Sequence, residues 1–168
     1  MVVSNASPLI TLARIGHLDY LPGLFELVHI SREVHDEIVV AGAGRPGAAG
    51  VMRADWIRVM PVRDHAAMAG AFERFSLGAG ETSAVQLARE LGAELLLMDE
   101  RRGRKMASEA GIAVMGCVGI LEELHRRDVW ADLRGAYQEL LRQNMRIDQR
   151  TLQMSLEHFK LVPLEISK

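Results

Sequence analysis

The sequence has one cysteine, few aromatic residues and no excess of charge of either sign. Its single cysteine, Cys117, excludes an internal disulfide bond and a cysteine-based zinc cluster, and it fits a reducing compartment. Aromatic residues make up 5% of the chain, which does not indicate a stacking platform for nucleic-acid bases. The 20 lysines and arginines against 22 acids give a net charge of −2, so any contact with nucleic acid must come from a local patch.

Long apolar runs are also missing from the sequence. No run reaches the roughly 18 residues that a membrane-spanning helix needs. The segment Met1–Ile10 has no basic lead and has Asn5 and Ser7 within its apolar run, so it does not resemble a secretory signal. We expect a cytoplasmic protein that makes no contact with a membrane. Its 168 residues, 49% of them hydrophobic, are typical of one globular domain.

Short apolar runs alternate with helical patterns along most of the chain. The predicted strands are Val2–Asn5, Leu24–Ile30, Trp56–Met60, Ala93–Met98 and Ile112–Met115. The predicted helices are Pro8–Ile15, Glu33–Ala41, Asp64–Phe75, Glu81–Leu91, Arg101–Ala110 and Val118–Arg127, the first preceded by Ser7 and the second capped by Ser31. This order predicts a three-layer α/β fold with a mainly parallel sheet.

Only helical patterns follow Asp128, over Leu133–Arg142 and Gln149–Phe159. We interpret residues 128–168 as a helical extension that packs on the domain formed by residues 1–127.

The glycine-rich segment Gly42–Gly47 matches the letters of a dinucleotide-binding fingerprint. That fingerprint needs a buried strand before the glycines and a helix that starts at the third one. A helix capped by Ser31 precedes this segment, and Pro46 lies inside it, so we interpret it as a loop. A nucleotide-cofactor enzyme built on this loop remains an alternative hypothesis.

Four polar residues fall where strands end or helices begin. Ligands of an open parallel sheet bind beyond the carboxyl ends of its strands. Asn5 and Asp99 end two predicted strands, and if those strands are neighbours their side chains lie roughly 5 to 6 Å apart. Glu81 opens the helix that returns to this edge, and Glu37 lies on the helix after the second strand. Such oxygen ligands favour Mg²⁺ or Mn²⁺ over zinc.

Each of these residues also has a simpler interpretation. Glu81 can complement a helix dipole, Glu37 can lie on a solvated helix face, and Asp99 can cap the next helix. The pattern alone leaves these alternatives open.

Four segments of the sequence resemble the acidic motifs of PIN domains in order and spacing. They are Val3–Ile10, Glu33–Ile38, Gly80–Ala88 and Leu97–Glu100. The similarity is greatest to a prokaryotic branch related to the VapC-like ribonucleases of toxin–antitoxin pairs, in which Asp99–Ala107 and Gly116–Leu121 are also typical. The resemblance covers roughly residues 1–127, and the region 142–147 is similar to the helical tail of that branch.

The resemblance implies a metal-dependent ribonuclease that uses Mg²⁺ or Mn²⁺. It implies RNA as substrate, a small antitoxin protein as partner, and a homodimer. Residue by residue, it assigns the catalytic and metal-binding positions to Asn5, Glu37, Glu81 and Asp99. PIN domains usually carry aspartate where Asn5 stands, and a neutral amide oxygen binds a metal ion less strongly than a carboxylate. Glu81 in place of aspartate keeps the negative charge and changes only the distance of the carboxylate from the backbone.

Cations cluster directly after Asp99, and a hydroxyl residue follows Asn5. In the branch that the sequence resembles, these positions imply contacts with phosphate groups. The nucleic-acid-binding candidates are Ser7, Arg101, Arg102, Arg104 and Lys105. An exposed helix face for the cations and a helix cap for Ser7 are the alternatives. A PIN-like protein that binds RNA or a protein partner without cleaving RNA is the second functional hypothesis, and Asn5 is the residue on which the choice depends.

Overall fold

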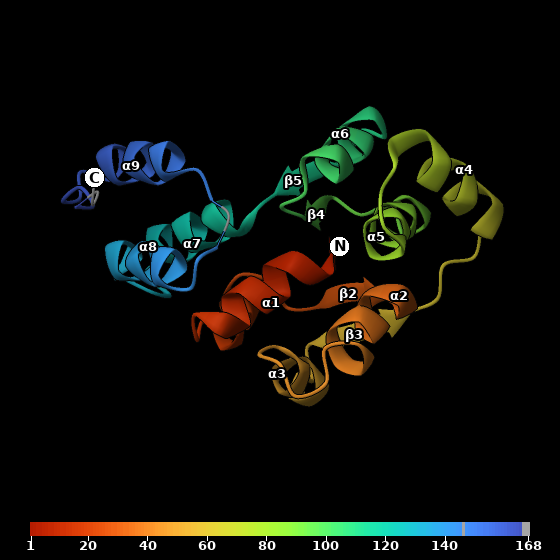
Figure 1. Ribbon diagram of the computed structural model, residues 1–168, viewed down its shortest axis with the longest axis horizontal. Coiled ribbons are helices and arrows are strands. Elements are labelled where there is room, and N and C mark those ends of the chain that lie inside the picture. The colour runs from red at the N-terminus through yellow and green to blue at the C-terminus, as the bar shows by residue number, and fades with distance from the viewer. Residues whose placement is uncertain (146, 166–168) are drawn as a thin grey trace.

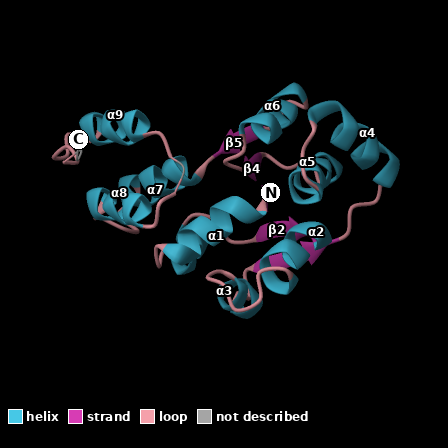
Figure 2. Cartoon of the chain, viewed as in Figure 1, coloured by secondary structure: helices cyan, strands magenta, loops and turns pink. Residues whose placement is uncertain are grey.

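The computed structural model describes residues 1–145 and 147–165. It contains a single sheet with the strands β1 (Val2–Ser4), β2 (Val28–Ser31), β3 (Ile57–Met60), β4 (Leu95–Leu97) and β5 (Ala113–Met115). The strand order is β3-β2-β1-β4-β5, and every neighbouring pair is parallel. Figure 2 shows the sheet with helices around it. The predicted α/β fold with a parallel sheet is confirmed. The short strand β3 lies at an edge of that sheet.

Helices make up most of the rest of the described chain. They are α1 (Ala6–Arg14), α2 (Arg32–His35), α3 (Ala48–Arg53), α4 (His65–Phe75), α5 (Ala79–Glu90), α6 (Arg101–Glu109), α7 (Cys117–Arg126), α8 (Leu133–Arg142) and α9 (Gln149–His158), with a 3₁₀ helix η1 (Leu18–Gly23) and a π-helical turn η2 (Asp36–Val40). Helix α5 packs against β1, β2 and β4, and its residues 82–88 are all buried. The crossover from β1 to β2 and the crossover from β3 to β4 run in opposite directions along the sheet, so right-handed connections place α1 on the opposite face from α5.

Helix α8 packs against α7 and α9 packs against α8, at the end of the molecule where the chain is drawn in blue in Figure 1. Leu140 of α8 and Leu156 of α9 are fully buried. The hydroxyl groups of Tyr137 and Ser155 share a buried hydrogen bond of 2.7 Å that joins α8 to α9. These contacts tie residues 133–158 to the sheet domain through one continuous core. No helix within the described ranges is both long and apolar enough to cross a membrane.

The predicted strand Leu24–Ile30 is wrong in its first half. The structure has η1 over Leu18–Gly23, and β2 begins only at Val28. Leu18 and Leu21 are buried, and the backbone N–H of Phe25 donates to the Leu21 carbonyl at 2.9 Å, so the chain is still turning there. An apolar run of this length does not by itself separate a strand from a buried turn, which is the reason for the error.

Two other local predictions need correction. The first helix begins at Ala6, not at Pro8, and Asn5 rather than Ser7 occupies the N-cap position. The segment predicted as a loop through Gly50 contains α3, because Ala48 and Val51 are buried against the core. Gly47 precedes that helix with a φ of 105°, a conformation that favours glycine. The helix predicted over Glu33–Ala41 is divided into α2 and η2.

The Gly42–Gly47 segment follows η2 and is not preceded by a strand. The arrangement that a dinucleotide site requires is therefore missing from this part of the described chain, and the interpretation of Gly42–Gly47 as a loop is confirmed.

Candidate functional site

Asn5 and Asp99 follow two strands that lie side by side. Ser4 of β1 is in register with Leu97 of β4, and the Asn5 N–H donates to the Leu97 carbonyl at 2.9 Å. Asn5 is only 2% exposed. Its Oδ1 atom is buried and has no hydrogen-bond partner among the described residues, and its side chain makes no capping bond to α1. A buried amide oxygen without a partner is costly, so it marks a position where a ligand would be stabilising.

Glu37 and Glu81 approach each other beside Gly80. Glu37 lies on η2 and Glu81 in the first turn of α5, and both line one cavity of about 620 Å³. A side chain at position 80 would collide with Oε2 of Glu37 and come within 3.6 Å of Oδ1 of Asn5. Because Gly80 has no side chain, Oε2 of Glu37 and Oδ1 of Asn5 can both lie close to the start of α5. Partial burial, followed by repulsion from Glu81, raises the pKa of Glu37 above its ordinary value.

A buried hydrogen-bond chain joins the two elements that carry these acids. Ser31, the N-cap of α2, accepts from the Val34 N–H at 3.0 Å. The hydroxyl groups of Ser31 and Ser83 lie 2.7 Å apart, and Ser83 on α5 also donates to the Gly80 carbonyl at 3.0 Å. Both serines are fully buried. The chain fixes the first turn of α5, with Glu81, against the helix that leads to Glu37.

Asp99 lies in a neighbouring environment. It is exposed at the rim of a different cavity, which Ser7, Arg101 and Arg104 also line. Its Oδ1 atom accepts from the backbone N–H of Cys117 at 2.7 Å, at the start of α7. Burial of the carboxyl group raises the pKa of Asp99 above its ordinary value. The Cys117 N–H, the Arg104 charge and the nearby Ser7 hydroxyl each lower that pKa in part. The simpler interpretation of Asp99 as the cap of the next helix is wrong, because Glu100 caps α6. Asp99 instead accepts from the first residue of α7 and also faces the cavity.

The sequence-based site is divided between these two cavities. Within residues 1–145 and 147–165, no three side chains of His, Cys, Asp or Glu are close enough to hold a metal ion as they stand. The oxygen atoms beside Gly80 still form a set suited to a hard cation, because the amide oxygen of Asn5 has no other partner and the two glutamates repel each other. The oxygen atoms of Asn5, Glu37 and Glu81 therefore fit a divalent ion in their chemistry, whereas Asp99 lies in the other cavity.

The candidate nucleic-acid contacts are divided as well. Arg101 and Arg104 line the cavity that contains Asp99 and Ser7. Arg102 instead donates to the Ser76 carbonyl at 3.3 Å, and Lys105 is exposed. Ser7 is not the helix cap that its sequence position suggested. Its hydroxyl oxygen is buried and has no hydrogen-bond partner within the described chain.

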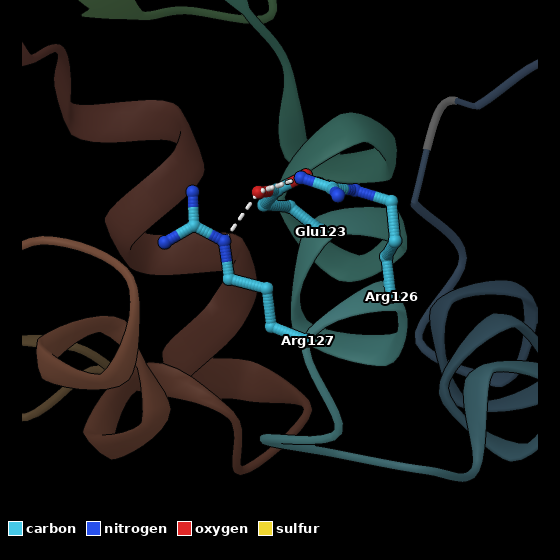
Figure 3. Close-up of polar contacts among 3 residues, drawn as sticks. All are labelled: Glu123, Arg126 and Arg127. Carbon is cyan, nitrogen blue, oxygen red and sulfur yellow. Dashed lines mark hydrogen bonds and ion pairs between the residues drawn. The ribbon is translucent and has the colours of Figure 1, made fainter.

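A cluster on α7, away from both cavities, contains an acid whose charge is neutralised by neighbouring arginines. Glu123 on α7 accepts hydrogen bonds from Arg126 and Arg127, the shortest with each being 2.5 Å long, as Figure 3 shows. The bonds from Arg126, and then those from Arg127, lower the pKa of Glu123. Here cations and acid satisfy one another, which neither of the two cavities achieves.

Three residues that shape the candidate site were not predicted to do so from the sequence. Gly80, Ser31 and Ser83 act through contacts between segments far apart in the chain. The one available signal was Ser83 itself, a polar residue beside the predicted buried stripe of its helix. The partner of such a residue is invisible without the fold.

The comparisons with known proteins agree with this geometry. No curated protein is significantly similar to the sequence. A family model described as a PIN domain matches residues 1–160, and so includes the C-terminal helices α8 and α9. Since this match spans most of the chain, and the parallel sheet with its polar strand ends agrees with it, the chain belongs to the PIN-domain family.

Proposed function

We propose that the protein is a divalent-metal-dependent endoribonuclease that hydrolyses phosphodiester bonds of RNA. Its membership of the PIN-domain family supports a nuclease-type activity. The observation that carries the proposal is the buried Oδ1 atom of Asn5, which has no partner within the described chain and faces the space beside Gly80 where Glu37 and Glu81 gather. An unsatisfied oxygen beside two mutually repelling carboxylates is an arrangement that a cation stabilises.

The residues that would hold the ion are Asn5, Glu37, Glu81 and Asp99. All four supply oxygen atoms, which favours Mg²⁺ or Mn²⁺. A bound ion of this kind neutralises charge on the scissile phosphate and makes a water molecule more nucleophilic.

The chain's own residues provide the rest of the chemistry. Arg101 and Arg104 lie in the cavity with Asp99 and can neutralise the phosphate groups that flank the scissile one. The Cys117 N–H holds one oxygen of Asp99 in a fixed direction. The buried hydroxyl of Ser7, which has no partner among the described residues, is placed to donate to a substrate or to Asp99. Each group is positioned by an element of the fold before any substrate arrives.

The partners remain proposals that rest on the resemblance to VapC-like proteins. They are a small antitoxin protein and a second copy of the chain, with RNA as the substrate in the cytoplasm. The division into a PIN-like domain over residues 1–127 and an extension over 128–168 is likewise a proposal, supported by the packing of α8 against α7 and of α9 against α8.

The experiment compares the native protein with Asp99→Asn in cleavage of a mixed RNA pool with Mn²⁺. Asparagine keeps an oxygen that can accept from Cys117 but removes the charge. We expect activity to fall by more than the ~10- to 100-fold that loss of an outer-shell partner of a metal costs. The matched control is Asp55→Asn, an exposed aspartate next to β3, which should cleave like the native protein.

Equal activity of the native protein and Asp99→Asn would contradict the nuclease mechanism. A native protein that binds the RNA pool but leaves it intact with Mn²⁺ would favour the second hypothesis, RNA binding without cleavage.

A further inference from the structure

A cavity of about 910 Å³ extends from Asp99 between α1, α6, α7 and the start of α9. One wall comes from α1, whose residues Ser7, Thr11 and Arg14 follow each other at helical spacing along a single face. Arg101 and Arg104 form the wall on α6. The cavity therefore joins the sheet domain to the C-terminal helices and opens beside a residue of the proposed catalytic site.

The acids in this cavity are largely occupied by helix ends. One oxygen of Asp99 accepts from the first turn of α7. Asp148 caps α9, where its two oxygens accept from the Arg150 N–H at 3.2 Å and the Thr151 hydroxyl at 3.1 Å. Glu122 is the third acid of the lining. Hydrogen bonds to a helix N-terminus satisfy oxygen atoms of Asp99 and Asp148, and neither carboxylate forms a direct ion pair with Arg101 or Arg104 among the described residues.

The arginines of α6 have no direct ion-pair partner among the described residues, although the Arg104 charge is near enough to lower the pKa of Asp99. Neither Arg101 nor Arg104 forms an ion pair or donates a hydrogen bond within the described residues. Arg14 donates to the Gln143 carbonyl at 3.1 Å, a neutral partner at the end of α8. That bond holds the guanidinium at the junction between α1 and the C-terminal helices. The contrast is with Arg126 and Arg127, which Glu123 neutralises (Figure 3).

We propose that this cavity binds the phosphate backbone of a single RNA strand, with Arg14 facing one part of the strand and Arg101 with Arg104 another. This inference rests on the proposed function and extends it, because it assigns Arg14 and the C-terminal helices to the RNA-binding surface. The volume lies within the range of about 300 to 1,000 Å³ of small-ligand pockets, which suits a few nucleotides of one strand and not a duplex. No aromatic side chain lines the cavity among the described residues. The contacts are therefore to phosphates, and binding depends little on base sequence.

The test measures binding of a fluorescently labelled oligouridine by anisotropy in EDTA, over a series of salt concentrations. Each phosphate contact with a single strand contributes about 0.7 to the slope of log affinity against log salt. We expect Arg14→Gln, Arg101→Gln and Arg104→Gln each to lower that slope by about 0.7. Arg53→Gln, an exposed arginine on α3, is the matched control and should leave the slope unchanged.

Arg14→Gln also removes a hydrogen bond, so Arg14→Lys serves as its companion: it keeps the charge and should keep the native slope. Native slopes in Arg14→Gln, Arg101→Gln and Arg104→Gln would overturn the inference, as would an equal fall in Arg53→Gln. Because the measurement contains no metal, its outcome is independent of the Asp99→Asn cleavage experiment. Lowered slopes without any RNA cleavage would contradict the proposed nuclease activity and would still support RNA binding in this cavity.

Discussion

The two cavities beside the strand ends differ in which charge they leave unsatisfied. Beside Gly80, the acids Glu37 and Glu81 repel each other and the Asn5 oxygen has no partner within the described chain. Beside Asp99, helix N-termini satisfy carboxylates, while Arg101 and Arg104 form no direct ion pair within the described residues. The first cavity is suited to a cation and the second to an anion.

This difference indicates how a chain with a net charge of −2 can act on RNA. The fold separates its unsatisfied negative and positive charges into two sites. One lies near Asn5, which follows β1, and the other contains Asp99, which follows the neighbouring strand β4. Hydrolysis of a phosphodiester needs a cation at the scissile phosphate and neutralisation of the phosphates around it. The adjacent sites supply both requirements.

The largest effect is expected from adding a charge to the acidic cavity. Asn5→Asp places a carboxylate at a position that is 2% exposed and close to Glu37. An uncompensated buried charge should lower the unfolding free energy in EDTA by about 3 kcal/mol. The melting temperature should fall by about 6 to 12 °C, and MnCl₂ should restore most of the loss. Thermal unfolding with and without Mn²⁺ measures this. Asn144→Asp, at an exposed position, is the control, and an Asn5→Asp loss that Mn²⁺ leaves unchanged would contradict the site.

Moving one acid out of the acidic cavity should separate function from stability. In Gly80→Ala, the new methyl group displaces the flexible end of Glu37, whereas alanine favours the helix by about 1 kcal/mol. We expect Mn²⁺ affinity, measured by calorimetry, to fall by about 10- to 100-fold while the melting temperature does not decrease. Gly70→Ala on α4, where an added carbon meets open space, should leave Mn²⁺ affinity unchanged. Native affinity in Gly80→Ala would show that Glu37 takes no part.

A smaller effect should follow from loosening the connection between α2 and α5. Ser83→Ala removes its hydrogen bonds to Ser31 and the Gly80 carbonyl. The cost should be about 1 kcal/mol of unfolding free energy, or about 2 to 4 °C in melting temperature, with weaker Mn²⁺ binding. The exposed Ser108→Ala serves as control. If Ser83→Ala lost stability but bound Mn²⁺ like the native protein, the hydrogen bonds of Ser31 and Ser83 would not position Glu37 and Glu81.

The smallest effect is expected at the balanced cluster of Glu123, Arg126 and Arg127. Because the arginines lower the pKa of Glu123, its contribution to stability is present above the unfolded-state pKa and is lost as pH falls through the lowered value. Both arginines are at least half exposed, so Glu123→Gln should cost only about 0.2 to 1 kcal/mol at pH 7. The difference from the native protein should vanish well below about pH 4. Denaturant unfolding over pH measures it, and a difference that grows at low pH would contradict the assigned ion pairs.

Much of the fold followed from local patterns. The buried run Leu95–Leu97 and the amphipathic α5 have strong periodicity, and Ser31 is the helix cap that its residue type suggested. The alternation of strands and helices also placed Asn5 and Asp99 at strand ends, whereas the pairing of those two strands is known only from the structure. Such predictions succeed because burial and capping depend on residues close together in the sequence.

The remainder depends on contacts between distant segments. Ser83 meets Ser31 across 52 residues, and Arg14 meets the Gln143 carbonyl across 129. No local pattern distinguishes an arginine held at a helix end from one that is free in solvent. The division of the acids between two cavities was equally hidden, because side-chain direction at a strand end is set by the packing around it.

The most direct test of the acidic cavity is a crystal soaked in MnCl₂ and measured at a wavelength where manganese scatters anomalously. The account predicts an anomalous peak between Oδ1 of Asn5 and the carboxylates of Glu37 and Glu81. A well-ordered crystal with manganese peaks elsewhere and none beside Asn5 would contradict it.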